Sequence, residues 1–241
     1  ARNLGLEKAR GRYVMFFDGD DRLHPRTAAI TLLMAARDDL DTVMFDYRCF
    51  AYDSLKPIDH YWRLANHISK FPQNRSFAPV ELDQLPIYGS SCTYLWRRAF
   101  LEGIDARFPG MKLGEDLVWV LSVLSKVRKM RVLNAPLYEY RRGSPTSAVS
   151  RLQSNADDAP TLALKGLVDV LFQTRDVKHK ETLLKRMISD ILFYGEKMPK
   201  VSKWLSQEGF DAFGGVEYLK RVCPEQAERI EGLSKRDTAE S

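Results

Sequence analysis

The sequence predicts an α/β domain over residues 1–150, followed by a helical region over residues 151–241. In the first part, apolar runs over 13–17 and 42–47 enclose an acidic loop and a helical stretch. That order of strand, loop, helix and strand is typical of α/β proteins. Beyond residue 160, apolar residues recur at helical spacing. The stretch 142–160 is rich in Ser, Pro, Asn and Asp, so we expect it to link the two parts.

The elements of the first part follow in order. A helix ends near Gly11, and the run 13–17 is apolar on both faces, which predicts a central strand of a sheet covered on both sides. Pro25 opens a helix that continues to about Arg37. The other expected elements are strands over 42–47, 93–96, 130–133 and 137–141, a short helix over 98–102, and a strongly apolar, buried helix over 115–128. In the tail we expect helices over 161–173, 179–195, 200–208, 213–222 and 224–233.

Composition is that of a folded protein with a sizeable core, because 44% of the 241 residues are hydrophobic and 29% are charged. The net charge of +5 arises entirely within residues 1–150, which hold 22 Lys and Arg against 17 Asp and Glu. This excess favours an anionic small ligand or contact with an anionic membrane surface. A dense basic stripe with interleaved aromatic residues is absent from the sequence, so we expect no nucleic-acid partner. Three widely spaced cysteines favour a reducing compartment, the cytoplasm.

The first acidic cluster is Asp18, Asp20 and Asp21, separated by Gly19 and placed where the first apolar strand ends. Carboxylates so close together repel one another unless a cation lies among them, and hard ions such as Mg²⁺ or Mn²⁺ prefer oxygen ligands. Ligands of α/β sheets bind at the carboxyl ends of strands. The alternative is a solvated turn in which Asp21 caps the next helix.

The second cluster is Glu115 and Asp116, directly before the apolar helix. Acidic residues in a first turn are favoured by the helix dipole, which is a sufficient structural reason for them. A carboxylate held rigidly at that position could also act as a general base.

A third motif places Arg141 and Arg142 beside a flexible Gly-Ser-Pro segment. Two guanidinium groups there could close over a phosphate. The alternative is an edge strand guarded by charged residues.

Taken together and in order, these motifs resemble a family 2 glycosyltransferase of the GT-A fold over roughly residues 1–150. The resemblance rests on Ala-Arg-Asn-Leu-Gly at 1–5, Gly-Arg-Tyr-Val at 11–14, Phe-Asp-Gly-Asp-Asp at 17–21 with Pro25, Tyr-Leu-Trp-Arg-Arg at 94–98, Phe-Pro-Gly at 108–110, Gly-Glu-Asp-Leu at 114–117, and Leu-Tyr-Glu-Tyr-Arg at 137–141. It implies a GT-A-like (Rossmann-like) mixed sheet flanked by helices, followed by the C-terminal helical region.

The resemblance also implies an activity: transfer of a sugar, with inversion, from a nucleotide-sugar donor to a glycan or lipid-linked acceptor hydroxyl, in cell-surface polysaccharide biosynthesis. Asp18 and Asp20 would hold Mn²⁺ or Mg²⁺ against the donor diphosphate, and Asp18 would also lie near the ribose. Asp21 would support the metal site or cap the helix. Acting at the inner face of the plasma membrane, such an enzyme would need at most a peripheral contact with it.

Residue by residue, the resemblance assigns five further positions. Asp116 would be the base that deprotonates the acceptor hydroxyl, with Glu115 as its neighbour. Arg2 and Asn3 would lie near the nucleotide. Arg141 would contact the donor diphosphate from a mobile loop.

The sequence departs from the family pattern at its start, where the first strands and an acidic residue that reads the base are expected. We therefore expect a partial nucleotide-binding domain that could be inactive by itself. A donor-binding module or scaffold without catalysis is one alternative. A phosphatase of the haloacid-dehalogenase type is a remote one, because Arg22 stands where that family has Thr or Val.

Overall fold

The computed structural model describes residues 1–58, 71–79, 90–110, 115–144 and 213–239, together with seven single positions between 168 and 211. The chain divides into two compact units. The first comprises Ala1–Glu81, Pro86–Gly110 and Glu115–Asn155, and the second comprises Leu82–Leu85, Met111–Gly114 and Ala156–Ser241.

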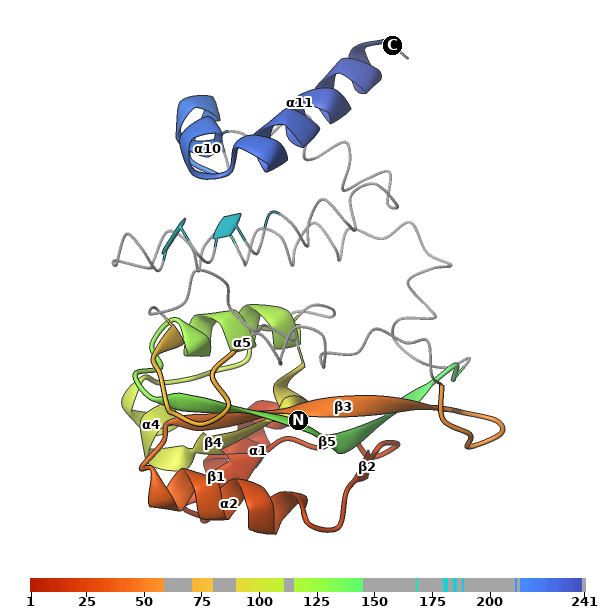
Figure 1. The fold of residues 1–241 in the computed structure, drawn as a ribbon, viewed down its shortest axis with the longest axis vertical. Helices are drawn as coiled ribbons and strands as arrows, with labels where there is room; N and C mark the ends of the chain where they lie inside the picture. Colours follow the sequence, from red (N-terminus) through yellow and green to blue (C-terminus); the bar gives the residue numbers. More distant parts are fainter. Residues whose placement is uncertain are drawn as a thin grey trace. The chain divides into compact units, whose positions relative to one another are not determined.

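A five-stranded mixed sheet forms the centre of the first unit (Figure 1). Its strands lie in the order β1 (Tyr13–Met15), β4 (Tyr94–Arg97), β3 (Thr42–Ala51), β5 (Met130–Arg142) and β2 (Arg22–Leu23). The neighbours β3 and β5 are parallel, whereas the other three pairs are antiparallel. The carboxyl ends of β3 and β5 therefore reach the same edge of the sheet, the edge at which α/β proteins bind ligands.

The position of β1 differs from the expectation of a central strand. Within the sheet that the described residues form, β1 pairs only with β4 and lies at one edge. The expectation of a sheet covered on both faces is confirmed, because α2 (Thr27–Arg37) and α5 (Glu115–Leu124) lie on opposite faces (Figure 1). An apolar run reports burial of both faces of a strand, but it carries no information about how many strands pair with it.

Alternating side chains of the strands supply the two halves of the core. On the α2 face, Val43 and Leu95 pack with Ala35. On the α5 face, the Trp119 ring contacts Trp96 and Phe16 edge-to-face, at centroid distances of 5.2 and 5.3 Å. Burial of such large aromatic side chains contributes much of the stabilisation of a small domain, and here it fixes the beginning of α5 against the end of β1.

Several element boundaries differ from those expected. The two strands expected over 130–133 and 137–141 are one strand, β5, which stays paired with β3 across an irregularity in register around Asp46. The helix expected over 115–128 ends at Leu124 and continues as turns. Predicted elements that are confirmed within a residue or two are β4, α2 and α4 (Arg98–Gly103). Among the described residues, the remaining helical elements of the first unit are α1 (Arg2–Lys8) and the short 3₁₀ helix η2 (Ser91–Thr93).

At the beginning of β3, the buried Asp41 carboxylate holds three chain segments together. It accepts hydrogen bonds from the Arg97 guanidinium at 2.6 Å and from the backbone amides of Arg128 and Lys129 at 2.9 and 3.1 Å. Each oxygen of this buried carboxylate therefore has a donor, one of them a cation, as a buried charge requires.

In the second unit, α10 (Val216–Val222) and α11 (Pro224–Ala239) follow one another, joined by a bond from the Ala227 amide to the Cys223 carbonyl. The helices expected over 213–222 and 224–233 correspond to these two, whereas those expected over 161–173, 179–195 and 200–208 lie largely or wholly outside the described residues, as does most of the expected linker. None of the helices in the described part of the chain is long and apolar enough to cross a bilayer.

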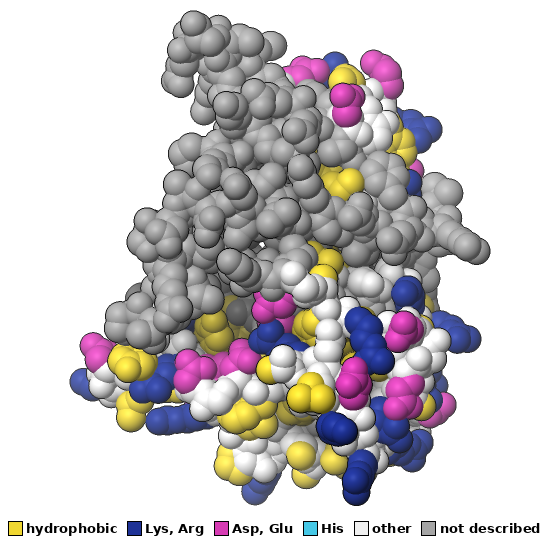
Figure 2. Space-filling view, turned by 180° about the vertical axis from the view of Figure 1, so that it is seen from behind, with side chains coloured by type: hydrophobic (Ala, Val, Ile, Leu, Met, Phe, Trp, Pro, Cys, Tyr) yellow, Lys and Arg dark blue, Asp and Glu magenta, His cyan; other side chains and the backbone are white. Residues whose placement is uncertain are grey.

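The described surface seen from behind carries Lys and Arg interspersed with Asp and Glu (Figure 2). Many of these charges form exposed ion pairs, such as Arg98 with Glu102. Exposed pairs of this kind add little stability.

Candidate functional site

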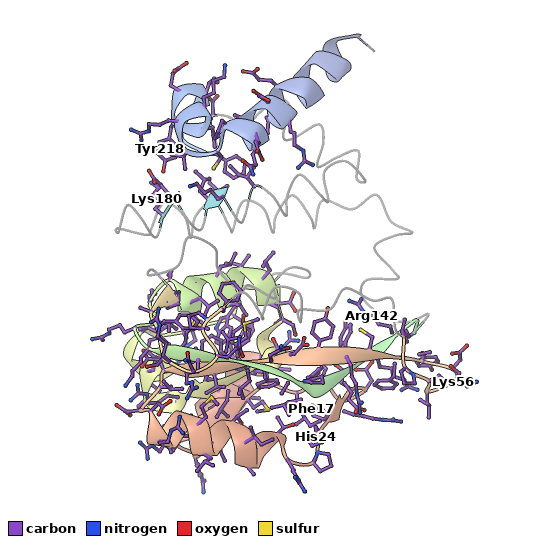
Figure 3. The ribbon with its side chains drawn as sticks, viewed as in Figure 1. Phe17, His24, Lys56, Arg142, Lys180 and Tyr218 are labelled. Carbon is purple, nitrogen blue, oxygen red and sulfur yellow. The ribbon has the colours of Figure 1, made fainter. Side chains whose placement is uncertain are left out.

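The first acidic cluster forms a tight turn between β1 and β2. The Asp21 amide donates to the Asp18 carbonyl at 3.1 Å, which closes the turn. Gly19 and Asp20 are exposed at its tip, and the Asp20 carboxylate makes no hydrogen bond or ion pair with the described residues. Phe17, labelled in Figure 3, lies just before the turn and is half exposed. Its ring contacts the Tyr138 ring edge-to-face at a centroid distance of 6.2 Å. The turn thus presents one carboxylate that has no hydrogen-bond or ion-pair partner in the described part of the chain.

Arg2, at the beginning of α1, joins the two acidic clusters. Its guanidinium lies 3.1 Å from Asp18 Oδ1, 2.9 Å from Glu115 Oε1 and 3.3 Å from Asp116 Oδ1. Burial acts to lower the pKa of Arg2, but the neighbouring carboxylates outweigh it and raise that pKa. Asp18 and Asp116 lie 16 and 114 positions after Arg2 in the sequence, and the fold brings both carboxylates to its guanidinium.

Asp116 is the more buried carboxylate of the second cluster. Its Oδ1 accepts a hydrogen bond from the Ser91 hydroxyl at 3.1 Å. Burial raises the pKa of Asp116 to about 6, although Arg2 and Ser91 act to lower it. A carboxylate with such a pKa is ionised at neutral pH yet basic enough to accept a proton, as a general base must be.

Asp21 is 7% exposed, and both of its oxygens have partners. The Tyr138 hydroxyl donates to Oδ2, and the Arg141 amide donates to Oδ1 at 2.7 Å. Burial raises the pKa of Asp21 to about 6, against the effect of these two bonds. Within the described residues, Asp21 connects the turn to β5, which leaves Asp18 and Asp20 as the carboxylates of the turn that are accessible from solvent.

Two residues that the resemblance assigned to the donor have other contacts in the structure. The Asn3 side chain pairs with the Phe108 backbone, donating to the carbonyl at 2.9 Å and accepting from the amide at 2.8 Å. The Arg141 guanidinium stacks over the Tyr52 ring at 4.2 Å and donates to the Tyr52 carbonyl at 3.2 Å. The structure therefore groups Arg2, Asp18, Glu115 and Asp116, and it keeps the Asn3 and Arg141 side chains outside that group.

The donor set of the acidic turn fits a hard divalent cation that is shared with a ligand. Among the described residues, no group of three or more His, Cys, Asp or Glu side chains could hold a metal ion by itself. Mg²⁺ is commonly held by one or two carboxylates together with substrate phosphates rather than by a complete protein cage. Asp18 and Asp20 could supply those carboxylates, since both are accessible and lie two residues apart.

Sequence reasoning did not assign roles to two residues that contact the acidic clusters, Ser91 and Tyr138. Ser91 carries no recognisable signal, because a three-residue 3₁₀ helix is too short to show a periodic pattern. Tyr138 alternates with polar residues in an apolar strand, a pattern typical of a core residue. Their partners lie 25 and 117 residues away in the chain, and only the fold brings them together.

Comparison with known sequences finds a family match in the part of the chain that carries these motifs. Residues 1–103 match the family described as "Glycosyl transferase family 2". The chain is 28% identical over 148 residues to the putative glycosyltransferase EpsH of Bacillus subtilis, covering 58% of this chain and 40% of that protein. It is 27% identical over 162 residues to the uncharacterized glycosyltransferase YibD of Escherichia coli, covering 63% and 44%. The matched region thus spans less than half of each curated relative.

Solved structures with a similar fold include TarS of S. aureus. The complex of TarS residues 1–349 with UDP has a TM-score of 0.60 at 13% identity, covering 100% of this chain and 70% of that one. The complex with UDP-GlcNAc has a TM-score of 0.57 at 13% identity, covering 100% and 71%. At this level of identity the likeness establishes the fold.

The family match, the mixed sheet and the acidic turn at its strand end agree with one another. The similarity to glycosyltransferase family 2 therefore covers residues 1–103, and the fold is GT-A-like.

Proposed function

We propose that the chain transfers a sugar from a nucleotide-sugar donor to a hydroxyl group of a glycan or lipid-linked acceptor, with inversion at the anomeric carbon. The observation that carries this proposal is the convergence on Arg2 of Asp18, from the acidic turn, and Asp116, from the beginning of α5. A transferase of this kind needs a donor-binding group and a base beside the same reacting centre. The family match of residues 1–103 supports the reaction class.

Asp116 is the base in this proposal. A sugar hydroxyl is a poor nucleophile until its proton is removed, and attack opposite the leaving group inverts the centre. The Ser91 hydroxyl orients the Asp116 carboxylate, and Arg2 keeps it ionised. Glu115 shares the Arg2 guanidinium and so helps to fix the orientation of that cation.

Asp18 and Asp20 bind the donor side. When bound, Mn²⁺ or Mg²⁺ would neutralise charge on the nucleoside diphosphate leaving group. Asp21 holds the turn in place, because neither of its oxygens is free. In this proposal Arg141 leaves its stack on Tyr52 to contact the diphosphate, since a stacked guanidinium keeps most of its in-plane donors.

The proposed donor carries a uridine nucleotide, and the proposed setting is the synthesis of cell-surface polysaccharides in the cytoplasm, with at most a peripheral membrane contact. The UDP and UDP-GlcNAc complexes of TarS support the nucleotide. Cys49, Cys92 and Cys223 are all free and buried, which supports a reducing compartment.

The test is calorimetric titration of the chain with UDP, in Mn²⁺ and in EDTA. We expect Mn²⁺ to increase UDP affinity by about ten-fold or more, and Asp20→Asn to abolish that increase. Asp105→Asn is the matched control, because Asp105 is an exposed carboxylate whose one described partner is Arg107, at 3.4 Å. An Asp20→Asn variant that keeps the full Mn²⁺ effect would refute the ligand role. UDP binding without transfer to any acceptor would instead favour the non-catalytic alternative.

A further inference from the structure

The Tyr138 hydroxyl contacts both ends of the acidic turn. Tyr138 is 1% exposed and lies in β5, next to the β2 residue Leu23. Its hydroxyl donates to Asp21 Oδ2 and accepts a long hydrogen bond, 3.4 Å, from the Asp18 amide. A buried phenol hydroxyl needs a partner, and both of these partners belong to the turn. The buried Cys92 thiol also lies within hydrogen-bond reach of the hydroxyl.

The same turn is also bonded to the Arg141 backbone. The Arg141 amide donates to the second oxygen of Asp21 at 2.7 Å. Asp21 therefore spans two β5 residues, Tyr138 through its side chain and Arg141 through its main chain. Pairing of Arg22 with Glu139 continues the attachment along β2.

We propose that Tyr138 is a positioning residue for the donor site. It works through a clamp formed by the Tyr138 hydroxyl, the Asp21 carboxylate, and the Asp18 and Arg141 amides. The clamp fixes the Asp18–Asp20 turn relative to Arg141. The Asp18 and Asp20 carboxylates and the Arg141 guanidinium can then bind the same diphosphate. This inference rests on the proposed function, and it adds a residue that touches neither donor nor acceptor.

The test separates positioning from simple loss of packing. Tyr138→Phe keeps the ring and removes the hydroxyl, so the carboxylates of the turn remain but lose their alignment. UDP affinity should fall about ten-fold in Mn²⁺ and change less than two-fold in EDTA, because only the metal-dependent part needs the aligned turn. A purely structural role would weaken both affinities equally, and that result would overturn the proposal.

Tyr13→Phe is the matched control. The Tyr13 hydroxyl is buried and has no hydrogen-bond partner among the described residues, so its removal should leave both UDP affinities unchanged. Asp21→Asn combined with Tyr138→Phe should be no worse than either change alone, because the amide oxygen of Asn still accepts from the Arg141 amide and both changes break the same Tyr138–Asp21 bond. Additive losses in the double variant would contradict the clamp.

Hydrogen exchange of the free protein tests the clamp without any ligand. Amides of residues 18–21 should exchange about ten-fold faster in Tyr138→Phe and at the wild-type rate in Tyr13→Phe. Unchanged exchange in Tyr138→Phe would overturn the clamp. If exchange rises while wild-type protein shows no Mn²⁺ effect on UDP binding, the clamp stands as a structural fact but not as a donor-positioning device. The proposed function then fails, and this inference fails with it.

Discussion

Asp41 and Asp21 are both 7% exposed, but their surroundings differ. Asp41, at the amino ends of β3 and β5, accepts from the Arg97 guanidinium and from two backbone amides. Asp21, near the carboxyl end of β5, accepts from one amide and one neutral hydroxyl, and the described residues form no ion pair with it. Burial raises the pKa of Asp21 to about 6.

The difference supports the proposal that one end of the sheet is organised for stability and the other for chemistry. A buried carboxylate with a cation and a full set of donors joins segments rigidly. At the other end, Asp21 and Asp116 both have a pKa raised to about 6, mainly by burial. Incompletely compensated carboxylates that cluster in this way are typical of functional sites.

The largest expected effect is the loss of turnover in Asp116→Asn, a change confined to the end of the sheet proposed to carry the chemistry. Asp116→Asn keeps the shape of the side chain and removes its basicity, so kcat should fall by about 10²- to 10⁴-fold. UDP affinity in Mn²⁺ should stay within about two-fold, because Asp116 contacts Arg2 and Ser91 rather than the turn. Steady-state kinetics and UDP titration on the same preparations measure both. Loss of UDP binding with retained turnover would refute the role of Asp116 as base.

The second prediction compares the two buried aspartates directly. Asp41→Asn should lower the free energy of unfolding by about 2–4 kcal/mol at pH 7.5, because it leaves Arg97 without one carboxylate partner and a backbone amide without an acceptor. Asp21→Asn should cost about 1 kcal/mol or less, since the lost hydrogen bond is offset by removal of a poorly compensated charge. Urea denaturation of the two variants measures the difference. Equal losses would remove the contrast between the two ends.

Part of this contrast could be predicted from the sequence. Asp18 and Asp20 are predicted site residues because acidic residues directly after a strand are a local pattern. Glu115 and Asp116 are predicted from the ordered family resemblance, since their position before an apolar helix has a sufficient structural reason. The pairing of β1 with β4 could not be predicted, because pairing depends on partners far along the chain. The Asn3–Phe108 and Asp21–Tyr138 contacts join residues more than 100 positions apart. Polar pairing over such separations leaves no periodic signal.

The third prediction concerns the pH dependence of stability. Burial raises the pKa of Asp21 and of Asp116 to about 6 in the folded protein, whereas an exposed aspartate has a pKa of about 4. The folded state therefore binds more protons than the unfolded state between pH 4 and 6, and the free energy of unfolding falls as pH rises through that window, by ~1–3 kcal/mol per group. Urea denaturation at pH 4.5 and 7 measures this fall, and Asp21→Asn should remove about half of it.

Asp38 provides the contrast for the same measurement. Hydrogen bonds from Arg37 and Arg131 lower its pKa to about 2, so its contribution to stability is lost only below pH 4. Asp38→Asn should therefore leave the slope between pH 4.5 and 7 unchanged. If the pH dependence of the free energy of unfolding disappeared in Asp38→Asn, Asp38 rather than Asp21 or Asp116 would be responsible for it.

The smallest expected effect sharpens the comparison by changing the only cation that bridges Asp18 and Asp116 among the described residues. The guanidinium of Arg2 acts to lower the pKa of Asp116, so Arg2→Gln should raise that pKa and move the acidic limb of the kcat profile to higher pH, by about one unit or less. Arg2→Lys keeps the charge but loses the forked guanidinium that reaches several carboxylates. The acidic limb of its kcat profile should therefore lie between those of the wild type and Arg2→Gln. Because a change in packing alone would lower kcat at every pH without moving the limb, the ordering wild type, Lys, Gln distinguishes an electrostatic role of Arg2 from a structural one.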